Sequence, residues 1–225
     1  MLLSLSTSGI PHVGADVGGF FGNPDEQLLV RWYQAGAFQP FFRAHAHLDS
    51  NRREPWLFNK TTTDAIREAI KRKYQLLPYW FVLISQFNID KITNVICRYT
   101  LFYEHTITGL PVMRPFWLEF SDDESGYDED RQWMVINIRL YVYNWTSHNI
   151  LNNNVRRVYI KGTIIPLRER VRRSSVLMRE DPISLYIALN MKGDFANGTI
   201  YMDDGESYGY EKGDFAYWGI TFKRF

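Results

Sequence analysis

Apolar and polar residues alternate in short blocks along the first third of the chain. Residues 10–16 form an apolar run that ends in a glycine-rich turn, which predicts a short buried strand. A helix is expected next, with Asn23 as its N-cap, Pro24 at its first position and Gly36 at its end. Its apolar stripe is predicted to comprise Leu28, Leu29, Trp32 and Ala35.

A second strand and helix follow in the same order. Residues 38–43 predict the strand, and residues 61–64 are expected to cap a longer helix. The apolar positions of that helix are Ile66, Ile70, Tyr74 and Leu77. Strand, loop and helix repeated twice predict two βα units, whereas a closed (β/α)8 barrel needs eight such units and about 250 residues.

From residue 110 the pattern changes to short strands separated by turns. The expected strands are 111–120, 155–166, 175–177, 184–189, 199–202 and 216–222. Clusters of Asp, Gly, Ser and Lys lie between these strands and are typical of turns. The second half is therefore predicted to be all-β, most simply a sandwich, with a domain boundary near residue 110.

Charge and composition exclude several classes of function. Lys and Arg number 26 and Asp and Glu 25, so neither a nucleic acid nor a membrane surface is an expected partner. The longest apolar stretch, 76–87, is too short to span a bilayer, and no signal peptide is visible. Cys97 is the single cysteine, so no internal disulfide is expected. Asn59, Asn144 and Asn197 head N-x-S/T triplets, which are weak indicators of a secretory origin.

Three ordered blocks carry a family resemblance. Residues 14–20 read GADVGGF, residues 29–38 read LVRWYQAGAF, and residues 40–47 read PFFRAHAH. They resemble the last two strands of the barrel in α-glucosidases of glycoside hydrolase family 31. The form FFRAHAH, continued by RREPW at 52–56, is most similar to the glucosidase II branch of that family. Further matching blocks are LLPYW at 76–80, GLPVMRP at 109–115, GTIIP at 162–166 and YMDDGES at 201–207.

The resemblance implies an α/β plus all-β fold. Residues 1–109 would be the C-terminal part of a (β/α)8 TIM barrel, containing its last two βα units. Residues 110–170 would form a proximal β-sandwich, partly disrupted, and residues 171–225 part of a distal β-sandwich. Two stretches, 81–99 and 136–155, depart from the family pattern and suggest retained non-coding sequence or misjoined exons.

The resemblance also assigns substrate-binding residues. His45 matches a histidine that hydrogen-bonds a glucose hydroxyl, Phe20 an aromatic that packs against the sugar, and Asp16 an acid beside the pocket. Without the resemblance, His45 would be an ordinary satisfied polar group, Phe20 a core residue and Asp16 a loop brace. Arg43 and His47 are expected behind these three. Residues 203–206 resemble a metal loop only superficially, because they lack calcium-loop spacing.

No catalytic residue is assigned. A retaining glycosidase needs two carboxyl groups roughly 5–5.5 Å apart. The family places its nucleophile in a W-x-D-M-N-E segment and its acid/base in a W-T-G-D-N segment, both upstream of GADVGGF and neither found in this chain. The chain alone is therefore expected to be inactive, and no metal or cofactor is expected.

The resemblance implies a fragment of a retaining α-glucosidase acting on a glucose-terminated oligosaccharide or N-glycan. It also implies residence in the endoplasmic-reticulum lumen, and it leaves open a contact with the non-catalytic β-subunit of glucosidase II. Two alternatives stay open: a non-catalytic remnant that binds carbohydrate or a partner, and an incomplete gene model without an independent function.

Overall fold

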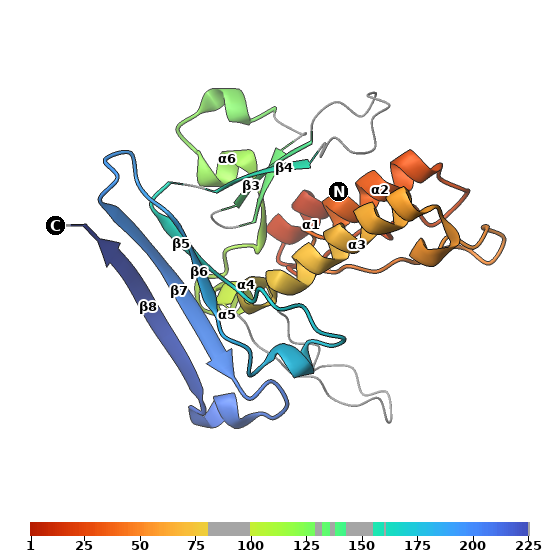
Figure 1. Cartoon of the computed structure of the whole chain (residues 1–225). Coiled ribbons are helices and arrows are strands. Elements are labelled where there is room, and N and C mark those ends of the chain that lie inside the picture. The colour runs from red at the N-terminus through yellow and green to blue at the C-terminus, as the bar shows by residue number, and fades with distance from the viewer. Residues whose placement is uncertain (81–99, 129–131, 136–137, 143–154, 160, 225) are drawn as a thin grey trace. The chain divides into compact units, whose positions relative to one another are not determined.

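The computed structural model describes residues 1–80, 100–128, 132–135, 138–142, 155–159 and 161–224 (Figure 1). The chain divides into two compact units. The first comprises residues 1–73 and 113–158, and the second comprises residues 74–112 and 159–225.

The first unit contains three helices before its sheet: α1 (Leu2–Thr7), α2 (Glu26–Gly36) and α3 (Lys60–Gln75, whose last two residues enter the second unit). Helices α2 and α3 lie side by side (Figure 1). A short 3-10 helix, η1 (Pro55–Leu57), precedes α3. The buried core between α2, α3 and the first loop consists of Val17, Leu29, Val30, Tyr33, Ile66 and Ala69.

Helix α2 ends at Gly36 as predicted, but its cap is Asp25 rather than Asn23. The Asp25 carboxylate accepts a hydrogen bond of 2.7 Å from the backbone N–H of Leu28, which satisfies one of the free donors of the first turn. The Asn23 side chain instead accepts from the N–H of Asn51, at 2.7 Å. The prediction failed because the longer-range bond from Asn51 occupies the Asn23 side chain.

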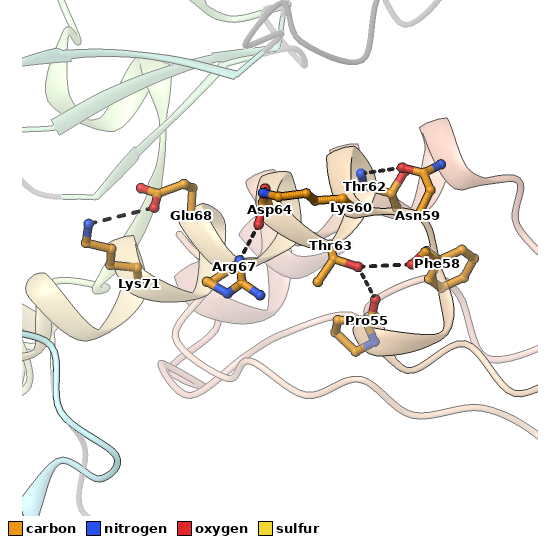
Figure 2. Close-up of polar contacts among 10 residues, drawn as sticks. All are labelled: Pro55, Phe58, Asn59, Lys60, Thr62, Thr63, Asp64, Arg67, Glu68 and Lys71. Atoms are coloured by element: carbon orange, nitrogen blue, oxygen red, sulfur yellow. Dashed lines mark hydrogen bonds and ion pairs between the residues drawn. The ribbon is translucent and has the colours of Figure 1, made fainter.

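Helix α3 begins earlier than predicted, and Asn59 caps it (Figure 2). Asn59 Oδ1 accepts from the N–H of Thr62 at 3.0 Å. The residues expected to cap the helix lie in its first turns, where Asp64 pairs with Lys60 and Arg67. Thr63 Oγ1 donates to the carbonyl of Pro55 at 2.8 Å and so ties the helix to η1.

The strands predicted at 10–16 and 38–43 are wrong, because neither segment is a regular strand. The two segments do run beside each other. The N–H of Phe41 donates to Val13 at 2.9 Å, and the N–H of Val17 donates to Arg43 at 2.8 Å. These bonds join the segments without forming the regular ladder that defines strand pairing.

The sheet of the first unit has four strands in the order β1-β2-β3-β4: β1 (Met113–Pro115), β2 (Gln132–Val135), β3 (Ile138–Val142) and β4 (Val155–Tyr159). Strands β1 and β2, and β2 and β3, pair antiparallel. The strand expected at 111–120 is shorter, because α6 (Phe116–Glu119) begins directly after Pro115 and buries Phe116; η2 (Glu124–Gly126) follows. The stretch 81–99 and most of 136–155 lie outside the described residues.

The second unit pairs two short helices with a second sheet. The helices are α4 (Leu77–Trp80) and α5 (Thr100–Thr108). The sheet has the order β6-β5-β7-β8: β6 (Ser184–Ala188), β5 (Thr163–Leu167), β7 (Phe195–Asp203) and β8 (Phe215–Lys223) (Figure 1). Strands β5 and β7 are parallel, and the other neighbours are antiparallel. Tyr103 of α5 stacks on Tyr201 of β7, with ring centroids 4.5 Å apart.

The strand predictions for this unit are mostly confirmed. Strands β6, β7 and β8 occupy the predicted positions, and the last two extend further than expected. The strand at 175–177 is wrong, because η3 (Val176–Met178) is a 3-10 helix; η4 (Gly209–Lys212) precedes β8. The single strand expected at 155–166 is two strands of different sheets. Within the described residues each unit has one four-stranded sheet, so the sandwiches and the three domain ranges stay predictions.

Among the helices in the described part of the chain, none is long and apolar enough to cross a membrane.

Candidate functional site

Asp16 and Arg43 form an ion pair between the two adjacent loop segments of the first unit. Arg43 Nε and Nη2 both donate to Asp16 Oδ1, at 3.1 and 2.9 Å. The Asp16 side chain is 19% exposed and that of Arg43 51% exposed. The Arg43 guanidinium also lies over the Phe41 ring, 5.0 Å from its centroid. The Asp16 carboxylate is therefore bonded to a neighbouring arginine.

Phe20 and His45 lie together at the ends of the same two segments. Their ring centroids are 5.3 Å apart. His47 joins them, at 5.9 Å from Phe20 and 5.4 Å from Phe21. The N–H of His47 donates to the carbonyl of Phe20 at 2.8 Å, which fixes the backbone of one segment against the other. His45 is exposed and Phe20 half-buried, so an imidazole and an aromatic ring are available side by side.

Arg53 links the two segments that carry Phe20 and His45, and the sequence interpretation gave it no role. Its Nη1 donates to the carbonyl of Gly18 at 2.7 Å. Its Nη2 donates to the carbonyls of Gly19 and His45, the latter at 3.0 Å. One guanidinium therefore bonds both loops. Arg53 lies within the RREPW block, but that block served only as a mark of the family resemblance.

A glycine pair makes the carbonyls available to Arg53. Gly18 and Gly19 have φ of +90° and +79°, a region that residues with a side chain rarely adopt. A turn closes across them, in which the N–H of Gly19 donates to the carbonyl of Asp16 at 2.9 Å. A β-carbon at Gly18 would lie 3.2 Å from Cζ and Nη1 of Arg53, so the missing side chain also makes room for the guanidinium.

Beneath the loops, Lys73 and Gln39 link helix α3 to the segment before Asp16. The buried Lys73 ammonium donates to the carbonyl of Gln39 at 2.6 Å. Gln39 Oε1 accepts from the N–H of Ala15 at 2.9 Å. Burial lowers the pKa of Lys73 to about 7. Burial, and then the charge of Lys73, lower the pKa of His12 below its ordinary value.

Hydrogen bonds and an ion pair with nearby residues hold the loop at 203–206. Asp204 Oδ1 accepts from the backbone N–H groups of Glu206 and Ser207, both at 3.1 Å, and Arg179 pairs with Glu206 at 3.0 Å. These bonds favour the structural interpretation of the loop. Within the described ranges, no group of three or more His, Cys, Asp or Glu side chains could hold a metal ion.

Comparison with known families identifies the first part of the chain. Residues 1–83 match the model of the "Glycosyl hydrolases family 31 TIM-barrel domain". All three of the predicted site residues, and Arg53, lie within this match.

Relatives extend the similarity over the whole chain. It is 42% identical to "Neutral alpha-glucosidase AB" of Dictyostelium discoideum over 256 aligned residues, covering 99% of this chain and 25% of the relative. It is 38% identical to the human protein of the same name, covering 94% of this chain and 24% of that one. The chain thus spans about a quarter of the length of these relatives. The first alignment is longer than the 225-residue chain, so the relative contains residues without a counterpart here.

Solved structures give the same result. A crystal structure of a glucosidase II alpha subunit, titled as bound to Glc1Man2, matches with a TM-score of 0.83 and 32% identity, covering 99% of this chain and 26% of that one. A family 31 alpha-glucosidase from Bacteroides thetaiotaomicron matches with a TM-score of 0.82 and 31% identity, covering 100% of this chain and 36% of that one.

Proposed function

Because residues 1–83 belong to the TIM-barrel domain of the family 31 glycosyl hydrolases, we propose that this chain supplies one wall of the glucose pocket of a glucosidase II-like α-glucosidase. The observation that supports this most directly is the pairing of Phe20 with His45, with ring centroids 5.3 Å apart. An aromatic face beside an imidazole suits a sugar, whose C–H groups pack on the ring while the imidazole donates or accepts at a hydroxyl.

In this proposal Phe20 packs against the terminal glucose and His45 hydrogen-bonds one of its hydroxyls. Asp16 acts through Arg43, since the two donors of Arg43 already occupy one oxygen of the Asp16 carboxylate. The ion pair then presents the guanidinium, half exposed, toward the solvent side of the rim. His47 also contacts Phe20, with ring centroids 5.9 Å apart.

Bond cleavage needs two carboxyl groups, which we assign to the family segments that this sequence does not contain. The chain would then bind glucose weakly and hydrolyse nothing by itself. The proposed architecture is the last two βα units of the barrel within residues 1–109, followed by the proximal sandwich at 110–170 and the distal sandwich at 171–225. The high similarity of the whole chain to glucosidase II structures supports this assignment.

The substrate we propose is a glucose-terminated N-glycan, processed in the lumen of the endoplasmic reticulum. One matched structure is titled as a heterodimeric complex of the catalytic subunit with the binding domain of a regulatory subunit. We accordingly propose a regulatory β-subunit as a protein partner of the complete enzyme.

The pocket wall is tested by titrating the isotope-labelled chain with methyl α-D-glucoside and following backbone amide resonances. We expect shifts concentrated at residues 18–20 and 45–47, and weaker binding in the His45→Ala and Phe20→Leu variants. Arg52→Ala is the matched control, because Arg52 is exposed and its guanidinium bonds Glu54 rather than a residue of the rim. Shifts spread evenly over the chain, or equal affinity in all variants, would contradict the proposal.

Hydrolysis is tested separately with p-nitrophenyl α-D-glucoside. The chain alone should release no p-nitrophenol. A chimera of the Dictyostelium relative, with its aligned quarter replaced by this chain, should release it and lose that activity in the His45→Ala form. Turnover by the chain alone would show that the assignment of the carboxylates is wrong.

A further inference from the structure

The Arg53 side chain bonds the backbone on both sides of the Phe20–His45 pair. Its guanidinium donates to Gly18 and Gly19, directly before Phe20, and to the carbonyl of His45 itself. The two rings that would face the sugar are thus fixed through their backbones by a single cation. Its neighbour Arg52 is exposed and bonds Glu54 instead, through Nε at 2.9 Å and Nη2 at 2.6 Å.

We propose that Arg53 is the positioning residue of the glucose-binding rim, setting sugar affinity by holding Phe20 and His45 at a fixed spacing without touching the sugar. This inference rests on the proposed function for its ligand, while the positioning itself can be observed without any sugar. Only the sugar-binding readout depends on both.

The chemistry of arginine suits this task. A planar guanidinium offers five N–H donors in a fixed fork, so it can satisfy several carbonyls in different directions at once. A lysine ammonium keeps the charge but lacks the fork. Carbonyl oxygens that lose a charged donor at a partly buried site incur a desolvation cost and tend to turn toward water, which would move the loop at Gly18 and Gly19.

A substitution at Gly18 tests the Arg53 contact without changing Arg53 itself. A β-carbon at Gly18 would press on the Arg53 guanidinium at 3.2 Å and on Leu29 Cδ1 at 3.0 Å, and it would also strain the backbone at φ +90°. Gly22 has a similar φ of +73°, but nothing lies within 4 Å of its added β-carbon. The difference between Gly18→Ala and Gly22→Ala therefore separates crowding of Arg53 and Leu29 from backbone strain, and comparison with Arg53→Lys shows which part of the crowding effect runs through Arg53.

The first experiment uses NMR on the wild-type chain without sugar. We expect the Nη nitrogens of Arg53 to give separate, slowly exchanging signals, because carbonyls hold both of them. We also expect a nuclear Overhauser effect between the ring protons of Phe20 and His45. A freely rotating Arg53 guanidinium in the folded wild-type chain would overturn the proposal, and no variant needs to fold for this readout.

The second experiment compares Arg53→Lys with Arg52→Lys. Arg53→Lys should abolish the Phe20–His45 effect and weaken binding of methyl α-D-glucoside by roughly tenfold, the loss expected when one hydrogen bond to the sugar is no longer positioned. Arg52→Lys should change neither. Gly18→Ala should reproduce the Arg53→Lys result, and Gly22→Ala should not.

The outcomes distinguish this inference from the proposed function. If the wild type binds no glucoside at the rim but Arg53→Lys still separates the two rings, the proposed function fails and the positioning role stands. If glucoside binds equally to the wild type and Arg53→Lys, with the Phe20–His45 effect unchanged, the positioning role is refuted and the proposed function stands.

Discussion

The backbone of Gly14 lies so close to Phe41 that a β-carbon at position 14 would sit 1.9 Å from the Phe41 carbonyl oxygen. The atom in the way is backbone, and the same segment is joined to its neighbour by the bond from the Phe41 N–H to Val13, at 2.9 Å. Neither side can give way without separating the segments that carry Asp16 and Arg43. Glycine at this position is therefore a requirement of backbone approach rather than of φ.

Gly14→Ala should destabilise the chain by about 3 kcal/mol, since overpacking against fixed atoms costs about 1–3 kcal/mol and this contact is severe. Urea denaturation followed by circular dichroism measures the change. Gly219→Ala is the control, because nothing lies within 4 Å of its added β-carbon. It should leave stability unchanged or raise it by up to about 1 kcal/mol. Equal effects of the two substitutions would refute the role given to Gly14.

Asn59 joins the starts of α2 and α3 through both ends of its amide. Its Oδ1 accepts from the N–H of Thr62 at 3.0 Å, and its Nδ2 donates to Glu26 Oε2 at 2.9 Å. Asn59→Ala should cost about 1–2 kcal/mol, the range for a lost helix cap. Asn197→Ala is a matched control, because Asn197 also begins an N-x-T triplet but is exposed on β7, and its substitution should cost less than about 0.5 kcal/mol. A smaller cost at Asn59 than at Asn197 would contradict this prediction.

Because of Lys73, the free energy of unfolding is expected to rise with pH above pH 7. Its pKa is lowered from 10.5 to about 7 in the folded chain by burial. Between these values the unfolded chain binds a proton that the folded chain does not, so stability rises with pH through this window, by about 1.4 kcal/mol for each pH unit. Below pH 7 both states hold the proton, and the full cost of burying the ammonium is present.

Urea denaturation at several pH values between 7 and 10 tests this prediction. The slope should vanish in Lys73→Met and persist in Lys71→Met, where an exposed lysine of the same helix is replaced. His12 contributes little in this range, because its pKa is lowered from 6.5 and it is neutral throughout. A wild-type slope no steeper than that of Lys73→Met would exclude the lowered pKa of Lys73.

Helices and strands with clear periodicity were predicted more accurately than the residues that cap the helices. Helix α2 ends at Gly36, and β6, β7 and β8 occupy expected positions, because periodicity and turn residues mark them clearly. The cap of α2 was predicted wrongly because a contact distant in sequence decides it: Asn23 bonds Asn51, and Asp25 caps the helix.

The candidate site was predicted only in part, for a related reason. Family blocks pointed to Asp16, Phe20 and His45, and the structure brings Phe20 and His45 together. The links to Arg53 run to backbone carbonyls 8 to 35 residues away, and such bonds have no side-chain pattern that a sequence could reveal. Likewise, the burial of Lys73 depends on how α3 packs and cannot be seen in its charged sequence context.

The two helices that flank residues 81–99 meet directly. Thr100 Oγ1, at the start of α5, donates to the carbonyl of Pro78 in α4 at 3.3 Å, across 22 positions of sequence. Removing the 19 residues 81–99 would reduce this separation to 3, which is the spacing of an ordinary bond from a threonine hydroxyl to a carbonyl one helical turn earlier. After the deletion, the contact would have the sequence spacing of a bond within a single helix.

We predict that a chain with Trp80 joined directly to Thr100 folds with unchanged or higher stability, because a shorter connection between two contacting helices lowers the entropy cost of bringing them together. Urea denaturation should give a free energy of unfolding no lower than that of the full chain, and the Tyr103–Tyr201 contact should persist in NMR spectra. A matched control deletes 100–108, the residues of α5, and should abolish cooperative unfolding, because the buried Leu101 and Phe102 are lost with them. If the variant that lacks residues 81–99 no longer unfolds cooperatively, this stretch is part of the fold.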